Sequence, residues 1–151
     1  MRHRDFRARR RLGDLFVIRV AGRIVAPSQV GSVEVAVTRF NTRLVVVMGH
    51  SRRGVILATL EELRQPAERQ SSNLKSIVDR VRPSVETPLE TDAWHDFDTL
   101  VDRAVRANVR ASVDHLRHGS EVLERAIAND GLMVVGAEYS LETGIVDFFY
   151  E

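Results

Sequence analysis

The sequence predicts an α/β fold, in which a mainly parallel β-sheet is flanked by helices and ends in a C-terminal strand pair. Between residues 15 and 63, apolar runs rich in β-branched residues alternate with stretches whose apolar residues recur at helical spacing. This alternation is typical of a parallel sheet with right-handed crossovers. Near the C-terminus, two short apolar runs flank the turn "SLETG", which is the pattern of two neighbouring strands.

The first half of the chain contains two predicted strands and two predicted helices. Residues 15–20 form a short, wholly apolar run apart from one arginine, which predicts a strand covered on both faces. A helix is expected from Ser28, a suitable N-cap, to Phe40. A second strand follows at residues 43–48, and a second helix is expected over residues 53–63.

The second half begins with a polar stretch and ends in regular elements. Residues 64–90 contain three prolines, which predict a broken segment with one short amphipathic helix at residues 72–81. A long amphipathic helix is expected from Asp92 to Arg117, and Ser120 is the N-cap of a further helix. Two strands should follow, with the bounds 132–140 and 144–151.

Composition favours one globular domain with a basic extension. The chain has 151 residues, of which 44% are hydrophobic, and this is enough for a single core. Residues 1–11 hold six arginines and one aspartate, a net charge of +5, against −4 for the remainder. We therefore divide the chain into a basic N-terminal arm, residues 1–12, and an α/β domain, residues 13–151. Because Phe6 is the arm's only base-stacking residue, we expect a solvated arm rather than a nucleic-acid partner.

The same composition limits location and metal chemistry. No apolar run approaches the roughly 20 residues of a membrane span, and no secretory signal is recognisable, so we expect no membrane partner and a cytoplasmic location. The chain contains no cysteine, which excludes disulfides and thiolate metal ligands. His115 and His118 stand three residues apart in the long helix, but without a third donor we expect them on a solvated face.

Four separated blocks of the sequence resemble the β-class carbonic anhydrases. They are "GDLFVIRVAG", "VGSVEVAVTRFNTRLVVVMGHS", "AVRANVRASVDHLRHGS" and "GLMVVGAEYSLETGIVDFF", and they run in order from Gly13 onward. The resemblance implies that relatives hold one zinc ion with two cysteines and a histidine and hydrate carbon dioxide to bicarbonate. It also implies a homo-oligomer, either a dimer or a tetramer, and makes an intact carbonic anhydrase a candidate partner.

The resemblance also implies which residues would form the site. The family turn G-H-S-x-C-G matches residues 49–54, with His50 at the histidine ligand and Arg53 where the second cysteine belongs. The family motif C-x-D-x-R has one candidate match upstream. It keeps Asp5 and Arg7, which would be the catalytic dyad, and has His3 at the cysteine position. A further departure is Arg23, which replaces an asparagine common after the "RVAG" segment.

These departures oppose metal binding. A guanidinium has no lone pair to donate and stays protonated. At about 4 Å and an effective dielectric of 20, the electrostatic repulsion between the Arg53 charge and a divalent ion would be roughly 8 kcal/mol. We therefore expect no zinc cofactor and no hydration of carbon dioxide. One alternative is a residual zinc enzyme that uses His3, His50 and Asp5, and another is a nucleic-acid or anion-binding protein that uses the basic arm.

An anion site is a second interpretation of the same turn. A helix N-terminus favours anions, and the arginines around it could hold bicarbonate or phosphate. The candidate anion-binding residues are Arg19, Ser51, Arg52 and Arg53. In the alternative interpretation, Arg53 fills the vacated pocket and pairs with a carboxylate such as Asp5.

One question about the sheet stays open at this stage. In the family, the upstream motif lies on a central strand, and here no apolar run precedes Leu15 to form it. The strands at residues 15–20 and 43–48 would then either close together or leave a gap that another chain could fill.

Overall fold

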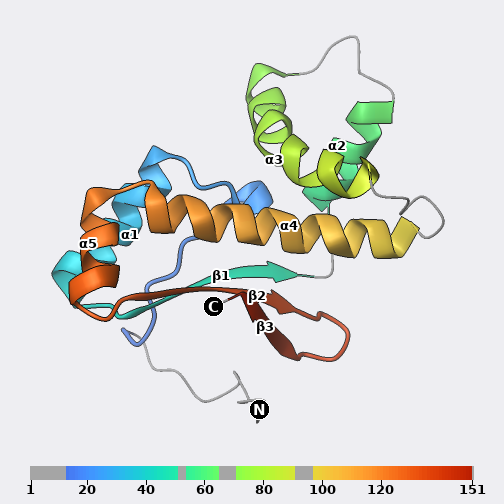
Figure 1. The fold of residues 1–151 in the computed structure, drawn as a ribbon. Helices are drawn as coiled ribbons and strands as arrows, with labels where there is room; N and C mark the ends of the chain where they lie inside the picture. Colours follow the sequence, from blue (N-terminus) through green and yellow to red (C-terminus); the bar gives the residue numbers. More distant parts are fainter. Residues whose placement is uncertain (1–12, 51–53, 65–70, 91–96, 151) are drawn as a thin grey trace.

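The structure is a computed structural model that describes residues 13–50, 54–64, 71–90 and 97–150. The basic arm therefore lies outside the described residues, and its extent and role stay predictions. The elements are the 3₁₀ helix η1 (Ala21–Arg23), α1 (Pro27–Phe40), β1 (Leu44–His50), α2 (Gly54–Arg64), α3 (Ser72–Glu90), α4 (Phe97–His118), α5 (Glu121–Asn129), β2 (Met133–Tyr139) and β3 (Val146–Tyr150) (Figure 1).

The sheet confirms the predicted α/β class and the C-terminal strand pair. Its order is β1-β2-β3. β1 runs parallel to β2, with Leu44 opposite Met133 and His50 opposite Tyr139. β2 and β3 are antiparallel and joined by the predicted turn, with an irregularity between Gly136 and Ala137. The carboxyl ends of β1 and β2 consequently lie next to each other.

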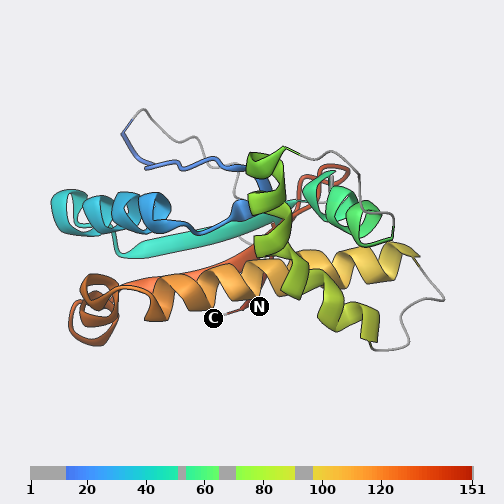
Figure 2. The ribbon, with the colours of Figure 1, turned by 90° about the horizontal axis from the view of Figure 1, so that it is seen from above.

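The long helix α4 organises the core. Four valines of α4 are buried at helical spacing: Val101, Val105, Val109 and Val113. One cluster joins α1, α4, α5 and the sheet, and a second joins α2, α3 and α4. Figure 2 shows α4 running along the sheet, with α1 and α5 at one end and α2 and α3 at the other. α4 thus connects the two halves of the core and passes beside the carboxyl end of β1.

Two predicted helix boundaries were wrong. α3 continues to Glu90 through Pro83, although the prolines predicted a break. Its stripe of Val78, Val81 and Val85 is fully buried, and this burial offsets the hydrogen bond that proline cannot donate. α1 begins at Pro27 rather than after a Ser28 cap, because proline suits the first helical position. The predicted Ser120 cap is confirmed, since its Oγ accepts a hydrogen bond from the Leu123 amide at 3.3 Å.

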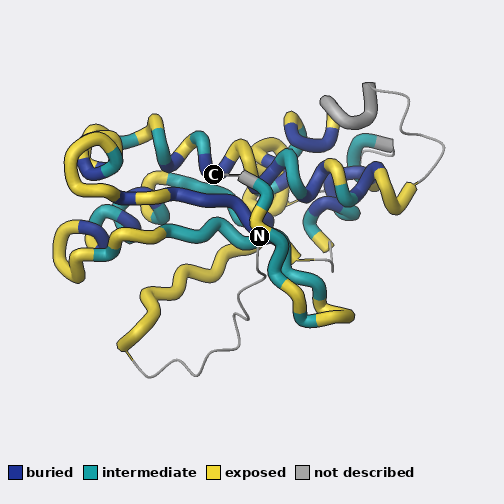
Figure 3. Tube along the Cα trace, turned by 60° about the horizontal axis from the view of Figure 1, so that its bottom comes forward, coloured by how far each residue is buried: buried dark blue, intermediate teal, exposed yellow. Residues whose placement is uncertain are grey.

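The predicted strand at residues 15–20 was also wrong. These residues form no ladder in the structure and stay exposed, with Val17 62% and Leu15 51% accessible. Figure 3 shows this run set apart from the sheet. A strand requires a hydrogen-bonded neighbour, and among the described residues β1 has only β2 beside it. Of the two alternatives, β1 and the apolar segment stay apart rather than closing together.

Each of the described helices is too short or too polar to cross a bilayer.

Candidate functional site

The candidate site lies at the carboxyl end of β1. His50 is the last residue of β1 and its ring is exposed. Gly49, just before it, is buried against α4: a Cβ there would lie 3.1 Å from Val105 Cγ1 and 3.2 Å from Val109 Cγ2. Close packing of β1 on α4 therefore fixes the backbone that carries His50. Ser51, Arg52 and Arg53 lie outside the described residues, so their role in an anion site stays a prediction.

The side chain of Arg23, in η1, reaches this end of β1. Arg23 donates a hydrogen bond from Nε to the carbonyl oxygen of Met48 at 2.7 Å. Arg23 and Gly22 both have left-handed backbones, with φ of 53° and 67°. No other hydrogen bond from the Arg23 side chain to the described part of the chain is found. The half-buried guanidinium therefore has donors beside the strand end that no described residue accepts from.

Two buried polar residues of α4 hold the η1 turn in place. Asn108 donates from Nδ2 to the Gly22 carbonyl at 2.8 Å. The Ser112 hydroxyl shares its proton between the Arg23 carbonyl at 3.0 Å and the Asn108 carbonyl of its own helix at 2.9 Å. The sequence analysis missed both residues. Their signal was present, because Asn108 and Ser112 are polar residues four apart within the apolar stripe of α4.

The Arg23 charge shapes the electrostatics of the site. Burial lowers the pKa of Arg23, while the nearby Glu138 carboxylate opposes this effect. Arginine nevertheless stays protonated in proteins. Partial burial lowers the pKa of His50, and the positive charge of Arg23 lowers it further. The strand end is consequently a cationic position that disfavours a second positive charge.

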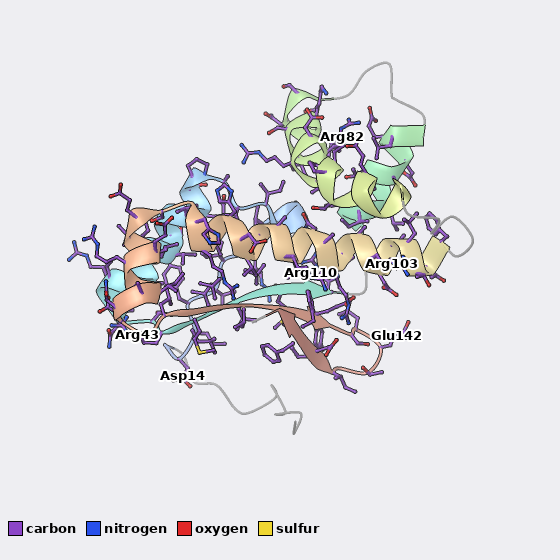
Figure 4. All side chains as sticks on the ribbon, in the orientation of Figure 1. Asp14, Arg43, Arg82, Arg103, Arg110 and Glu142 are labelled. Carbon is purple, nitrogen blue, oxygen red and sulfur yellow. The ribbon has the colours of Figure 1, made fainter. Side chains whose placement is uncertain are left out.

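An ion-pair cluster lies beside the carboxyl end of β2. Arg106 donates from Nε to Glu138 Oε2 at 3.1 Å and from Nη2 to Asp147 Oδ2 at 2.6 Å. Burial alone would lower the pKa of Arg106, but the bond to Asp147 and the Glu138 charge together raise it. These three residues line a pocket of about 290 Å³ with Ser140, Thr143 and Ile145. The cluster therefore links α4 to the β2–β3 pair. Arg110 of α4 lies nearby with its guanidinium 5.5 Å from the centre of the Phe149 ring, while Arg103 of α4 and Glu142 of the turn are exposed (Figure 4).

The remaining predicted site residues are not assembled by the described structure. Arg19 lies on the exposed segment and makes no hydrogen bond or ion pair there with described residues. His3, Asp5 and Arg7 lie outside the described residues. In the part of the chain that the structure describes, no group of three His, Cys, Asp or Glu could hold a metal.

The fold and this strand-end histidine define a β-carbonic-anhydrase-like α/β protein. A family model described as carbonic anhydrase matches residues 5–146, and the chain belongs to this family. It is 33% identical over 133 residues to carbonic anhydrase 2 of Mycobacterium tuberculosis, covering 88% of this chain and 61% of that one. It is also 33% identical over 136 residues to a carbonic anhydrase of Mycolicibacterium smegmatis, covering 90% and 63%. The chain thus spans about three fifths of the length of these relatives.

Solved structures agree with the fold. A tetrameric β-carbonic anhydrase of the ascomycete Sordaria macrospora superposes with a TM-score of 0.79 at 25% identity, covering 92% of this chain and 70% of that chain. A β-carbonic anhydrase of Aspergillus fumigatus superposes with a TM-score of 0.78 at 24% identity, covering 91% and 64%.

The pKa of His50 tests the proximity of Arg23. We expect it below the ordinary histidine range and expect it to rise in Arg23→Gln, because removing a positive charge favours the protonated ring. As the folded ring holds its proton less tightly than the unfolded one, its contribution to stability is present above the ordinary histidine pKa and is lost as pH falls through the lowered pKa of the folded protein.

An NMR titration of the His50 ring, assigned by its absence in His50→Gln, measures this shift. Arg43→Gln is the matched control, since Arg43 lies at the opposite end of β1 (Figure 4). An unchanged His50 titration in Arg23→Gln would show that the two side chains do not interact.

Proposed function

We propose that this chain is a non-catalytic member of the carbonic anhydrase family whose strand-end site binds a small oxyanion. The observation that carries the proposal is the Arg23 guanidinium beside the carboxyl end of β1, in a chain that contains no cysteine. We further propose that it acts in the cytoplasm as a homo-oligomer, alone or with an intact relative. The tetrameric Sordaria relative supports the oligomer.

The donor chemistry does not fit the family's zinc ion. A catalytic zinc site normally has three protein ligands, and of the family's two cysteines and one histidine this sequence retains His50 alone. A divalent ion bound to that ring would also be repelled by the same Arg23 charge that lowers its pKa. Without the metal there is no activated water for carbon dioxide to react with.

The charge and the hydrogen-bond donors of Arg23 favour the binding of an anion. Guanidinium donors recognise planar oxyanions through paired, charge-assisted hydrogen bonds, and Arg23 has donors that no described residue accepts from. Arg52 and Arg53, which the sequence analysis predicts to bind an anion, would add positive charge at the N-terminal end of α2. Bicarbonate and phosphate are small oxyanions that carry the charge this site favours.

Zinc content and carbon dioxide hydration test the catalytic half of the proposal. We expect less than stoichiometric zinc after purification in zinc-containing medium, and a hydration rate equal to that of buffer. Carbonic anhydrase 2 of M. tuberculosis, treated in parallel, is the reference. Stoichiometric zinc together with hydration that is lost in His50→Ala would contradict the proposal and support a residual enzyme.

Calorimetric titration with bicarbonate and with phosphate tests the anion half. We expect Arg23→Gln to weaken binding by about tenfold or more, because it removes a charge-assisted contact. Arg23→Lys should retain part of the affinity, and Arg43→Gln should retain all of it. Equal affinity in the wild type and Arg23→Gln would exclude Arg23 as a ligand.

A further inference from the structure

Glu138 of β2 is a negative charge placed between two arginines. Its Oε2 accepts the hydrogen bond from Arg106 Nε at 3.1 Å, and its side chain is only 14% exposed. Burial lowers the pKa of Arg23, and the Glu138 charge opposes this effect. Arg106 in turn bonds Asp147 of β3. Charges of alternating sign therefore follow the strand ends from η1 to β3, and Glu138 is the carboxylate that acts on Arg23.

Gly49 allows these two charges to interact across β1. In the parallel pairing of β1 with β2, Gly49 lies opposite Glu138, so the two residues share a face of the sheet. This is the face covered by α4, because α4 packs directly on Gly49 and supplies the Arg106 that Glu138 bonds. Arg23 reaches the carbonyl oxygen of Met48, the residue just before Gly49. Since glycine has no side chain, Gly49 places none between the guanidinium and the carboxylate.

A fixed carboxylate near Arg23 changes which anions the site favours. The electrostatic energy of a bound anion is proportional to its charge, whereas the cost of removing the anion from water rises with the square of that charge. A strongly positive site therefore favours doubly charged anions, and a weakly positive site favours singly charged ones. Glu138 lowers the positive potential at Arg23. Because Arg106 holds the Glu138 carboxylate in place, the carboxylate stays there when an anion binds.

We propose that Glu138 makes the anion site selective for singly charged oxyanions over doubly charged ones. The inference rests on the proposed anion site at Arg23, and it assigns Glu138 a role that requires no contact with the anion. The carboxylate acts through its charge alone. Neutralising it should therefore favour a doubly charged anion, in free energy, twice as much as a singly charged one.

Nitrate and sulfate are suitable probes, because nitrate is singly charged and sulfate doubly charged at every pH near neutrality. Calorimetric titration of the wild-type chain is expected to show tighter binding of nitrate. Glu138→Gln removes the charge but keeps an oxygen that can accept from Arg106. We expect this variant to raise the nitrate affinity about threefold and the sulfate affinity about ninefold, which is the square of the nitrate change.

Asp147→Asn is the matched control. It removes the same unit of charge from the same ion-pair cluster, but Asp147 lies on β3, which β2 separates from β1. The ratio of the sulfate and nitrate affinities should therefore change by less than about twofold. Arg106→Gln is a second test with the opposite sign. It removes the positive charge that partly offsets Glu138, so both affinities should fall, and that of sulfate should fall further.

Two kinds of negative result are distinguishable. If the anions bind but the ratio of their affinities is the same in the wild type, Glu138→Gln and Arg106→Gln, Glu138 does not set the selectivity and this inference alone is overturned. Tighter binding of sulfate than of nitrate by the wild type has the same meaning. If neither anion binds the wild type or any of the variants, the anion site itself is absent, and the proposed function fails together with the inference.

Discussion

Gly49→Val is expected to lower the free energy of unfolding by about 2 to 3 kcal/mol, the cost of overpacking a close contact in a core. The first added carbon alone would lie 3.1 Å from Val105 Cγ1 and 3.2 Å from Val109 Cγ2. Both valines are fully buried in α4, so neither can move into solvent. β1 must then shift away from α4, and His50 shifts with it.

Urea denaturation of the variant and the wild type measures this effect. Gly49→Val/Val105→Ala should recover part of the loss, because removing two methyl groups from Val105 makes room for the new side chain. Gly31→Ala is the control: its Cβ meets nothing within 4 Å in the middle of α1, and it should stabilise the protein by about 0.5 to 1 kcal/mol. If Gly49→Val is as stable as the wild type, β1 and α4 are not in close contact.

The elements that could be predicted from the sequence are those whose patterns are local. The apolar spacing that predicted a helix from Asp92 to Arg117 and the Ser120 cap lie within single helices. α4 runs from Phe97 to His118, α5 follows the predicted cap, and residues 92–96 of the prediction lie outside the described residues. α3 was misjudged because its prolines are visible in sequence, whereas the burial of Val81 and Val85 that compensates for them depends on α4. Residues 15–20 have a strand's composition, but a ladder also needs a neighbour, which composition cannot supply.

The candidate site likewise combines residues that could be predicted from the sequence with contacts that could not. His50 at a strand end could be placed from its motif, and Arg23 could be recognised as a departure from the family pattern. The contacts that build the site could not, because they join residues distant in sequence. Asn108 bonds Gly22 across 86 positions, and Arg106 bonds Glu138 across 32. The ion pair that Glu138 makes with α4 emerges only in the folded chain.

Asn108 connects core and site, and Asn108→Leu is expected to affect both. Leucine has a similar volume but no donor, so the Gly22 carbonyl loses its 2.8 Å bond inside the protein. Leaving a buried acceptor without a partner costs about 2 kcal/mol. Among the described residues, the Ser112 bond then remains to hold the η1 turn, with Gly22 and Arg23 in left-handed conformations, on α4. Arg23 should be held less firmly beside β1, and the pKa of His50 should rise toward its ordinary value.

Urea denaturation and the His50 titration, recorded on the same variant, separate this effect from general destabilisation. Thr59→Val is the matched control. Thr59 is fully buried, but its hydroxyl bonds the Val55 carbonyl within its own helix, and that carbonyl keeps its helical partner when the hydroxyl is removed. Thr59→Val should therefore leave the His50 pKa unchanged whatever its effect on stability. If Asn108→Leu also leaves the His50 pKa unchanged while lowering stability, Asn108 supports the core but does not position Arg23, and the Met48 and Ser112 bonds suffice to hold that charge at the strand end.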